Sequence, residues 1–560
     1  MTTPRHNRYG DRVRVSATGS RPHARRLNPP SPLWGSNGVA FGPDGRLYVA
    51  QYLAGQISAV DPATGDVEVI VPMDGPVQSP DDLAFGADGS MYIADLIPGR
   101  VWRRTPEGTY TVVSDEVKVV NGITCVGDRL FVNEMRTDGR LLELFPDGGE
   151  PVVLTEGLAL GNAMQLGPDG HLYYPHMMTD QVWRIPPDGG VPEVVAENVH
   201  QPVAVRFDQG GVLHVLSRGV EGIVTRIDLE GSGSRTLVTS GLVGLDNAAF
   251  DAENRMFVSS YASGGITELH PDGRTREIVP RGLDGPYGVT VDLGGTVYVA
   301  DHYRLASPAL TDEGDPVAVD VSGVAGGTNG ADGEGGVTSL TLMPFVHGVT
   351  TAGGLVHFTS QYGDVHTHDP GQRTTRQRAT GLNEPVGIAV GPDGSLVVAE
   401  AGAGRVVCID DSGEDGDTLT VLAEGLGHPV DVAFDAQGRC HVSDDGLGAV
   451  LRIGEDGTTA VVADGLGAPQ GLAILGDTLF TVETGPRRLT AISLSTGERR
   501  TEAEDLPVGQ PPGTAPRTAP ALFAHGMVGA PRPFAGLAAA PDGSLLLAAN
   551  GEGTVWQLKT

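Results

Sequence analysis

Short apolar runs alternate with tight turns along almost the whole chain. The clearest stretch begins at Asn37 and reads NGVAFGPDGRLYVAQYLAGQISAVDPATGDVEVIVP. Its apolar runs GVAF, RLYVA, QISAVD and VEVIV are separated by the turn GPDG, a short loop and a second turn. Four short strands that are joined by tight turns form one antiparallel sheet of about 36 residues, the pattern of a propeller blade.

The first strand of this unit and the turn after it recur along the chain. The later copies are DDLAFGADG from Asp81, NGITCVGD from Asn121, NAMQLGPDG from Asn162, VAVRFDQGG from Val203, DNAAFDAEN from Asp246, YGVTVDLGG from Tyr287, HGVTTAGG from His347, VGIAVGPDG from Val386, VDVAFDAQG from Val430, QGLAILGD from Gln470 and AGLAAAPDG from Ala535. Most copies are about 40 residues apart, the length of a blade. Twelve blades in one ring would leave a wide unfilled channel, whereas two rings of six lie within the known range.

The sequence therefore predicts an all-β chain of tandem six-bladed β-propellers with four-stranded antiparallel blades and twelve repeats in total. We expect an N-terminal segment over 1–29 with a ring-closing strand, a first propeller over 30–285 and a second over 286–560. A Gly-rich insertion (304–338) and a Pro-rich insertion (505–532) interrupt the second ring. Each is interpreted as a surface loop, with a lid over a pocket as the alternative.

The last repeat ends at GTVWQLKT, after its third strand, so an outer strand has to come from elsewhere. The alternating run RVRVS (Arg12–Ser16) is expected to become the outer strand of the sixth blade, which would leave TREIVP (Thr275–Pro280) to close the twelfth. In the alternative, TREIVP stays in the sixth blade and the N-terminal strand closes the twelfth.

Two positions of each unit are expected at one mouth of the ring. The first strand begins near the axis and the second strand returns to the same face, so the residue before the first strand and the last residue of the second share that mouth. In the first ring the residues before the first strand are Asn37, Asp81, Asn121, Asn162, Val203 and Asp246. The second strands end at Gln51, Asp95, Glu134, His176, Ser217 and Ser260.

Converging Asp and Asn oxygens suit a hard divalent cation, with Ca²⁺ favoured. Glu134 and His176 at the same mouth would serve as general acid and base. The alternative is that the Asn and Asp residues cap tight turns before the strands.

The second ring has a different mouth. Its corresponding residues are Tyr287, His347, Val386, Val430, Gln470 and Ala535 before the first strands, and Asp301, Ser360, Glu400, Asp444, Glu483 and Ala549 at the strand ends. The apolar members disfavour a metal on this axis, but Tyr287, His302, His347 and Glu483 could line a pocket for an organic ligand. The alternative is that the acidic strand ends make hydrogen bonds between blades.

The charge composition argues against nucleic acid and anionic membranes as binding partners. The formal net charge is -32, which repels nucleic acid and anionic membrane surfaces and either serves solubility or attracts cations. The N-terminal sequence has no apolar signal-peptide region and the chain has no run that could span a membrane, so a cytoplasmic location is expected. His357, His366 and His368 lie in one blade and either hold a transition metal or form a polar strand face.

The units NGVAFGPDGRLYVA, MYIADLIPGRV and GIAVGPDGSLVVAE resemble NHL repeats, and they are similar to the SMP-30/gluconolactonase/strictosidine-synthase-like superfamily of six-bladed propellers. The resemblance covers about residues 30–560. Its lactonase branch implies one axial divalent cation, held by a Glu in the first blade, an Asn in the fourth and an Asp in the fifth. Asn162 matches the fourth-blade ligand, and Asn121 has the third-blade position that helps to hold substrate. Asn37 and Val203 replace the other two ligands, so Asp81 and Asp246 would have to supply the carboxylates.

The leading hypothesis is an SMP-30-like enzyme that acts on a small organic substrate at the first ring's mouth, by lactone or ester hydrolysis or a related cyclisation or lyase step. The cation, held by Asn121, Asn162 and Asp246 with Asn37 or Asp81, would polarise a carbonyl group. The candidate catalytic residues are Glu134, His176 and Asp246.

Two other hypotheses stay open. One is a metal-free enzyme of the strictosidine-synthase or lyase type, with Glu134 and His176, or Glu483 and His347, as its catalytic groups. The other is a non-catalytic NHL-type propeller that binds a protein partner or acts as a scaffold.

Overall fold

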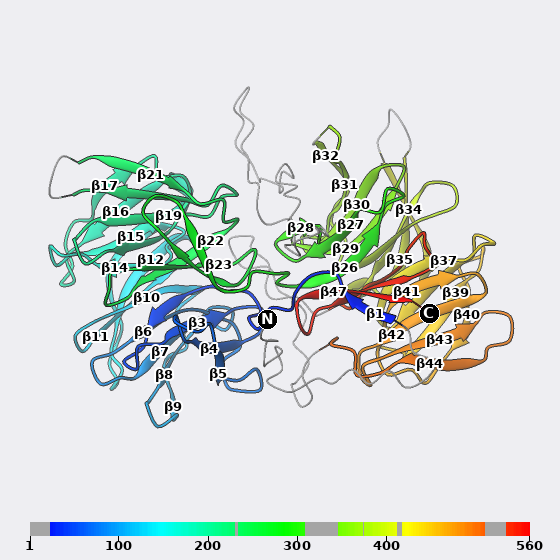
Figure 1. Cartoon of the computed structure of the whole chain (residues 1–560), viewed down its shortest axis with the longest axis horizontal. Coiled ribbons are helices and arrows are strands. Elements are labelled where there is room, and N and C mark those ends of the chain that lie inside the picture. Colours follow the sequence, from blue (N-terminus) through cyan, green and yellow to red (C-terminus); the bar gives the residue numbers. More distant parts are fainter. Residues whose placement is uncertain are drawn as a thin grey trace.

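The computed structural model describes residues 23–229, 233–308, 345–372, 374–411, 417–509 and 534–559. They form two rings of small antiparallel sheets that lie side by side (Figure 1). Eleven sheets have four strands each and one has three within the described residues. The chain is thus a tandem pair of six-bladed β-propellers, as the repeats predict.

The first propeller contains six blades in sequence order, with the innermost strand first in each. Its strands are β2 (Val39–Phe41), β3 (Leu47–Gln51), β4 (Gln56–Val60) and β5 (Val67–Val71) in blade one; β6 (Pro80–Phe85), β7 (Met91–Asp95), β8 (Arg100–Arg104) and β9 (Tyr110–Ser114) in blade two; β10 (Val120–Val126), β11 (Arg129–Glu134), β12 (Thr137–Leu144) and β13 (Val152–Ala159) in blade three; β14 (Gln165–Leu166), β15 (Leu172–His176), β16 (Gln181–Ile185) and β17 (Glu193–Glu197) in blade four; β18 (Pro202–Phe207), β19 (Leu213–Ser217), β20 (Ile223–Ile227) and β21 (Arg235–Thr239) in blade five; β22 (Leu245–Phe250), β23 (Met256–Ser260), β24 (Ile266–Leu269) and β25 (Thr275–Val279) in blade six.

The second propeller follows the same order. Its strands are β26 (Pro286–Val291), β27 (Val297–Asp301) and β28 (Arg304–Ala306) in blade seven; β29 (Val346–Ala352), β30 (Leu355–Ser360), β31 (Val365–Asp369) and β32 (Thr374–Ala379) in blade eight; β33 (Pro385–Val390), β34 (Leu396–Glu400), β35 (Arg405–Asp411) and β36 (Asp417–Glu424) in blade nine; β37 (Pro429–Phe434), β38 (Cys440–Asp444), β39 (Ala449–Ile453) and β40 (Thr459–Ala463) in blade ten; β41 (Pro469–Leu475), β42 (Thr478–Glu483), β43 (Arg488–Ser493) and β44 (Arg499–Ala503) in blade eleven; β45 (Leu537–Ala539), β46 (Leu545–Ala549), β47 (Thr554–Lys559) and β1 (His23–Arg26) in blade twelve. Two short 3-10 helices, η1 (Met177–Thr179) and η2 (Ala401–Ala403), follow second strands.

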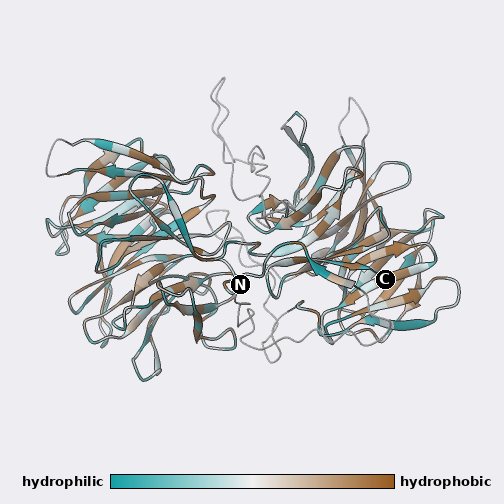
Figure 2. Cartoon of the chain, in the orientation of Figure 1, coloured by the Kyte–Doolittle hydropathy of each residue, from teal (hydrophilic) through white to brown (hydrophobic). Residues whose placement is uncertain are grey.

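The apolar runs become buried strands because each blade packs between two neighbours. Every residue of β3 and β7 is buried, whereas the outer strands β5 and β9 each have exposed and partly buried positions. Hydrophobic residues are spread over the strands of both rings (Figure 2). The clusters of apolar side chains therefore lie between adjacent blades. The same packing closes each ring, since Val39 of blade one packs with Phe257 of blade six and Val299 of blade seven with Leu546 of blade twelve.

Ring closure does not follow the leading expectation. Strand β25 pairs with β24 and stays in blade six, while β1 pairs with β47 and closes blade twelve. This is the alternative arrangement, but the closing strand is His23–Arg26, and the run at 12–16 lies outside the described residues. Keeping β25 beside β24 needs only the turn at 270–273, so it requires far less loop closure than a partner in the other ring.

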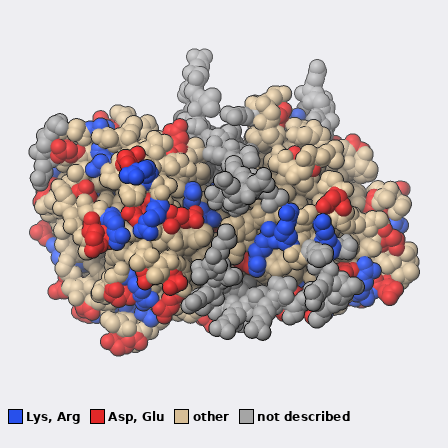
Figure 3. Space-filling view, in the orientation of Figure 1, with Lys and Arg blue, Asp and Glu red and all other residues tan. Residues whose placement is uncertain are grey.

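The two insertions lie mostly outside the described residues, apart from 304–308 and 505–509. Among the described residues, no helix is long and apolar enough to cross a membrane. Acidic and Arg side chains are interspersed over the visible face of the first propeller (Figure 3). Arg184, for example, pairs with both Asp169 and Glu193, so the negative net charge is not gathered into one acidic field there.

Candidate functional site

The six axial residues that the repeats predict for the first propeller all line one small cavity on its axis. The structure brings together Asn37, Asp81, Asn121, Asn162, Val203 and Asp246 around a space of about 50 Å³. Four of them, Asp81, Asn121, Val203 and Asp246, are the second residues of β6, β10, β18 and β22, whereas Asn37 and Asn162 lie just before β2 and β14. Each blade thus contributes one side chain to the cavity. A space of this size holds a few waters or one ion, but it is far smaller than the 300 Å³ or more of usual organic-ligand sites.

Asp81 accepts hydrogen bonds from two side-chain amides in this cavity. Its Oδ1 accepts from Asn37 Nδ2 at 3.4 Å, and its Oδ2 accepts from Asn121 Nδ2. Asn121 Oδ1 is buried and has no hydrogen-bond partner in the described part of the chain. Asn162 Oδ1 accepts from the backbone N–H of Ala163 at 2.7 Å. The carboxylate of Asp246 accepts no hydrogen bond from a described residue, although it borders the cavity.

The electrostatics of the cavity disfavour two ionised carboxylates. Burial, and then the charge of Asp82, raise the pKa of Asp81 to about 7. Burial, and then the charges of Asp81 and Asp82, raise the pKa of Asp246 well above its ordinary value. The guanidinium of Arg206 offsets these charges only in part. A site of this kind favours either a shared proton or a bound cation.

Asp82 follows Asp81 in the sequence, but its carboxylate forms hydrogen bonds between blades. Its carboxylate accepts from Leu83 N at 2.9 Å, from Asn247 Nδ2 at 3.0 Å and from Ile123 N at 3.3 Å, so it connects blades two, three and six. Burial still raises the pKa of Asp82 to about 6, against the opposing charge of Arg206.

Glu134 and His176 do not line the cavity. Glu134 binds Arg140 Nη2 at 2.6 Å, Arg136 Nε at 3.1 Å and a backbone N–H. Burial opposes its ionisation, but the bonds from Arg140 and Arg136 outweigh burial and lower the pKa of Glu134. His176 stacks on Trp183 with 5.0 Å between ring centroids, and burial lowers its pKa to about 4. Both side chains belong to the interior of their blades.

Glu134 and His176 miss the cavity because the residues that line it lie one position later than the last residue of each second strand. The side chains that line the cavity from that side are those just after the strand ends, namely Tyr52, Met135, Met177, Arg218 and Tyr261. Successive side chains of an extended segment point to opposite sides, so a position one residue out faces a neighbouring blade instead of the axis. The sequence does contain this signal, in the residue that follows each second strand.

One further side chain at the cavity comes from the second propeller. Tyr303 lies between β27 and β28 of blade seven, and it covers the mouth of the first propeller beside Tyr261, with 5.1 Å between ring centroids. Phe345 and Tyr303 belong to the apolar cluster that fills this mouth. Sequence reasoning missed Tyr303 because contacts between the rings have no repeat pattern.

At the second propeller, three of the four expected pocket residues lie together. Tyr287 contacts His302 and His347, with 5.9 and 5.3 Å between ring centroids, and Phe534 packs on His347 at 5.8 Å. Tyr287 and Phe534 also pack with Val386, Ala401 and Val430, so apolar side chains fill this mouth. Glu483 lies elsewhere, bound to Gly467 N and Arg488 Nε at 2.7 Å each, so these hydrogen bonds lie within its own blade and not between blades.

The histidines of blade eight are also held within the blade. His357 and His368 each bond a threonine hydroxyl, Thr367 at 2.8 Å and Thr375 at 2.9 Å. No group of three or more His, Cys, Asp or Glu side chains that could hold a metal ion occurs among the described residues. Any cation at the first axis would therefore depend on two carboxylates and on amide oxygens.

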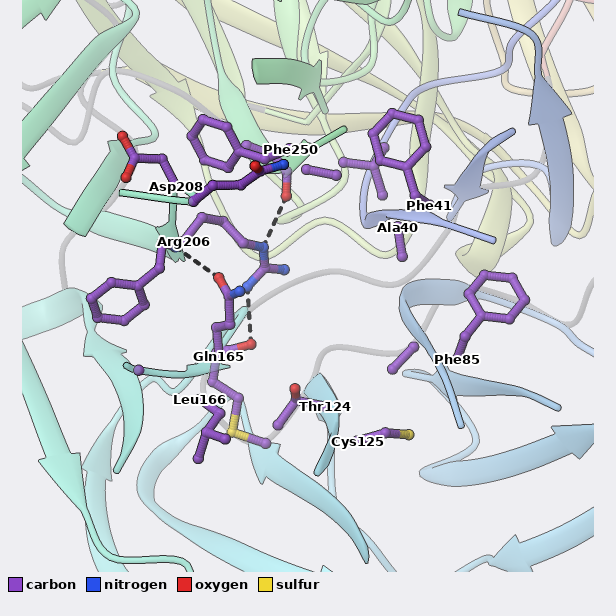
Figure 4. Close-up of a pocket in the computed structure, with 18 of the residues that line it drawn as sticks. Ala40, Phe41, Phe85, Thr124, Cys125, Gln165, Leu166, Arg206, Asp208 and Phe250 are labelled. Atoms are coloured by element: carbon purple, nitrogen blue, oxygen red, sulfur yellow. Dashed lines mark hydrogen bonds between the residues drawn. The ribbon is translucent and has the colours of Figure 1, made fainter. Parts of the chain in front are cut away.

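The far end of the first propeller's channel is wider, at about 540 Å³. Arg206 extends into it from β18 and donates to the carbonyl oxygens of Ala248 and Met164 at 2.9 Å each (Figure 4). Arg206 thus lines this channel while its guanidinium also interacts electrostatically with Asp82 and Asp246. The residue three positions after the axial one is Ala, Thr or Gln in the other eleven units, which marks Arg206 in the sequence.

No family model matches the sequence, and a comparison with curated proteins finds no match. Among solved structures, the chain is similar to a streptogramin B lyase (18% identity, 50% of this chain and 94% of that chain, TM-score 0.37). It is also similar to a nidogen/laminin complex (18% identity, 41% of this chain and 92% of that chain, TM-score 0.38). A third similar structure is an extracellular domain of a two-component system from B. thetaiotaomicron (10% identity, 93% of this chain and 75% of that chain, TM-score 0.32). These likenesses are too low to bear on function, and the strand order itself establishes the β-propeller fold.

Proposed function

We propose that the axial cavity of the first propeller is the active site of an SMP-30-like enzyme that acts on a small organic molecule. The reaction would be lactone or ester hydrolysis, or a related cyclisation or lyase step. The observation that supports this most is the pair Asp81 and Asp246, two carboxyl groups at the ring axis whose pKa values are raised chiefly by burial; the charge of Asp81 adds to the shift of Asp246. Perturbed carboxyl groups in a cavity are typical of catalytic sites, although blade contacts also perturb them.

The residues present fit a hard divalent cation, with Ca²⁺ favoured, because such ions take carboxylate and amide oxygens. Asp81 and Asp246 would hold it with Asn121, whose Oδ1 lacks a partner among the described residues, and with Asn162 and Asn37. When bound, the cation would polarise a carbonyl oxygen of the substrate. Its charge would also keep both carboxylates ionised.

Without a cation, the same two groups would serve as a proton-sharing pair. One carboxyl would be protonated and donate, while the other would accept, as paired acids with separated pKa values do. Glu134 and His176 have no part in this version, since neither borders the cavity. The proton chemistry would rest on Asp81 and Asp246 alone.

A second candidate is a non-catalytic scaffold. The observation in its favour is the ring of Tyr303, which closes the mouth of the first propeller and leaves about 50 Å³. In that case the buried carboxyl groups would serve only the joint between the rings.

Metal binding tests the proposal. We expect the melting temperature of the purified protein to rise with added Ca²⁺, and the rise to vanish in Asp246→Asn and Asp81→Asn. Asp431→Asn is the matched control, because Asp431 is a buried carboxylate of the second propeller that bonds Val432 N and Leu472 N. It should keep the Ca²⁺ shift.

Turnover of a panel of lactones and aryl esters tests the enzyme itself. We expect activity in the wild type and at least a hundredfold loss in Asp246→Asn. No turnover by any panel member, with no Ca²⁺ shift, would favour the scaffold. Turnover without a Ca²⁺ shift would favour the proton-sharing pair.

A further inference from the structure

The axial cavity is walled by side chains from all six blades of the first propeller and by one from the second, Tyr303. The six blades of the first propeller pack against one another in a closed ring, so their strands cannot move singly. Tyr303 is held differently, at the tip of a hairpin. Its side chain can therefore leave the cavity without opening the ring.

This hairpin is shorter than those of other blades. Asp301 of β27 pairs with Arg304 of β28, so only His302 and Tyr303 connect them. In blade two, by comparison, Asp95 pairs with Arg100 and four residues connect the strands. Arg304 Nε also donates to Asp301 Oδ2 at 3.0 Å, and His302 has a φ of +43°, as tight two-residue turns require. The short turn directs the Tyr303 ring out of its own blade and into the first propeller.

Tyr303 is held mainly by ring contacts. Its ring meets Tyr261 of the first propeller at 5.1 Å and Phe345 of the second at 5.7 Å, and it is 3% exposed. No described residue forms a hydrogen bond with its hydroxyl group, which faces the cavity with Asp81 and Asp246. Edge-on ring contacts are weak individually, so Tyr303 can withdraw without breaking a hydrogen bond of its side chain.

We propose that Tyr303 is a specificity-determining residue of the first propeller's site, supplied by the second propeller. With Tyr303 in place the site admits only water or an ion, and an organic ligand reaches Asp81 and Asp246 only when the Tyr303 side chain rotates out of the cavity. The identity of that ligand rests on the proposed function, whereas the closure itself does not.

Accessibility of a thiol in the cavity wall tests the closure. Met177 lines the cavity and is 4% exposed, so Met177→Cys places a reporter there. Cys125→Ser removes the native thiol at the far end of the channel. In this background we expect methyl methanethiosulfonate, followed by mass spectrometry, to modify Cys at 177 slowly, and at least tenfold faster when Tyr303→Ala is added. Tyr303→Phe keeps the ring and should keep the slow rate.

Tyr362→Ala is the matched control. Tyr362 packs on Phe345 at the same joint, with 5.3 Å between ring centroids, but it does not line the cavity. It should leave the rate unchanged. An equal rate in the Tyr303→Ala protein and its parent, or an equal acceleration by Tyr362→Ala, would overturn the proposal. If Tyr303→Ala fails to fold, Tyr303→Val, which keeps apolar contact without a ring, should still accelerate the modification.

The outcome separates this inference from the proposed function, because thiol modification needs neither a cation nor turnover. Faster thiol modification in the Tyr303→Ala protein, with no Ca²⁺ shift and no activity in the wild type, would support the closure by Tyr303 and reject the proposed enzyme function. A Ca²⁺ shift and activity without faster thiol modification would support the enzyme and reject the closure by Tyr303.

Discussion

Glu134 shows how a single buried carboxylate can serve the scaffold rather than the site. Its side chain is fully buried, and both Arg partners remain about a third exposed or less. Removing its charge leaves Arg136 and Arg140 without the carboxylate that both of them bind. The hydrogen bonds that Glu134 accepts therefore contribute to stability.

Glu134→Gln should lower the free energy of unfolding by about 1–3 kcal/mol, the range for losing hydrogen bonds to a charged group, reduced here by the partial exposure of the Arg partners. Urea denaturation measures it. Glu150→Gln, at an exposed position after β12, should have no effect. Unchanged stability of the Glu134→Gln variant, together with loss of its Ca²⁺ shift, would show that Glu134 takes part in the site.

His428 predicts a pH dependence of the second propeller. Burial opposes its charged form, but hydrogen bonds to Asp445 and Glu384 outweigh burial and raise its pKa from 6.5 to about 9. The Nδ1–Asp445 Oδ1 distance is 2.6 Å. A raised pKa means that the folded state binds the proton more tightly than the unfolded state. The resulting stability is complete below pH 6.5 and is lost as pH rises through about 9.

His428→Gln should remove this dependence. Melting temperatures between pH 6 and pH 10 should fall for the wild type and stay flatter for the variant, so that the two curves converge at the alkaline end. Parallel curves would mean that His428 is neutral in the folded protein.

The axial residues could be predicted from the sequence because the repeat fixes their place in each blade. Asn37, Asp81 and Asp246 lie where the unit puts them. For the second strands, the sequence predicts that the last residue lines the cavity, whereas in the structure the residue after it does. A shift of one position reverses the direction of a side chain in a strand. Periodicity locates a strand to within a residue or so, which is too coarse to tell Glu134 from Met135.

At the scale of elements, β1 shows the limit of a repeat for predicting closure. Every blade presents the same need for an outer strand, so the pattern does not specify which blade takes the N-terminal strand. Specific contacts decide it, since Arg26 pairs with Glu552 at 2.6 Å and lies over the ring of Trp556. Asn28 then accepts a hydrogen bond from Val555 N at 2.9 Å.

Replacing His23–Arg26 by Gly-Ser-Gly-Ser should lower the melting temperature of the second propeller and expose the edge of β47 to association. Calorimetry and light scattering measure these effects. Arg25→Ala, which removes an exposed side chain but keeps the strand, should leave both unchanged. A stable monomer after the replacement would show that β1 is dispensable for closure.

For the whole molecule, the joint between the propellers gives the pair its functional asymmetry. An aromatic series runs from Tyr261 in the first propeller through Tyr303 and His302 to Tyr287 on the second axis. The first axis keeps a polar cavity, whereas the second is filled by apolar side chains. Repeats predict the packing within each ring. The residues of this joint do not recur from unit to unit, so the repeat pattern could not predict it.

Phe345 lies at the centre of that joint, fully buried and in contact with His302, Tyr303 and Tyr362. Phe345→Ala should cost about 3–5 kcal/mol, as large-to-small core changes do, and most of that loss should fall on the coupling between the rings. Calorimetry should therefore show one transition in the wild type and two in the variant. Phe358→Ala removes an equally buried ring inside blade eight, so it should lower the stability of the second propeller without altering the coupling. Two transitions already present in the wild type would mean that the rings fold independently, and that Tyr303 closes the cavity without joining them thermodynamically.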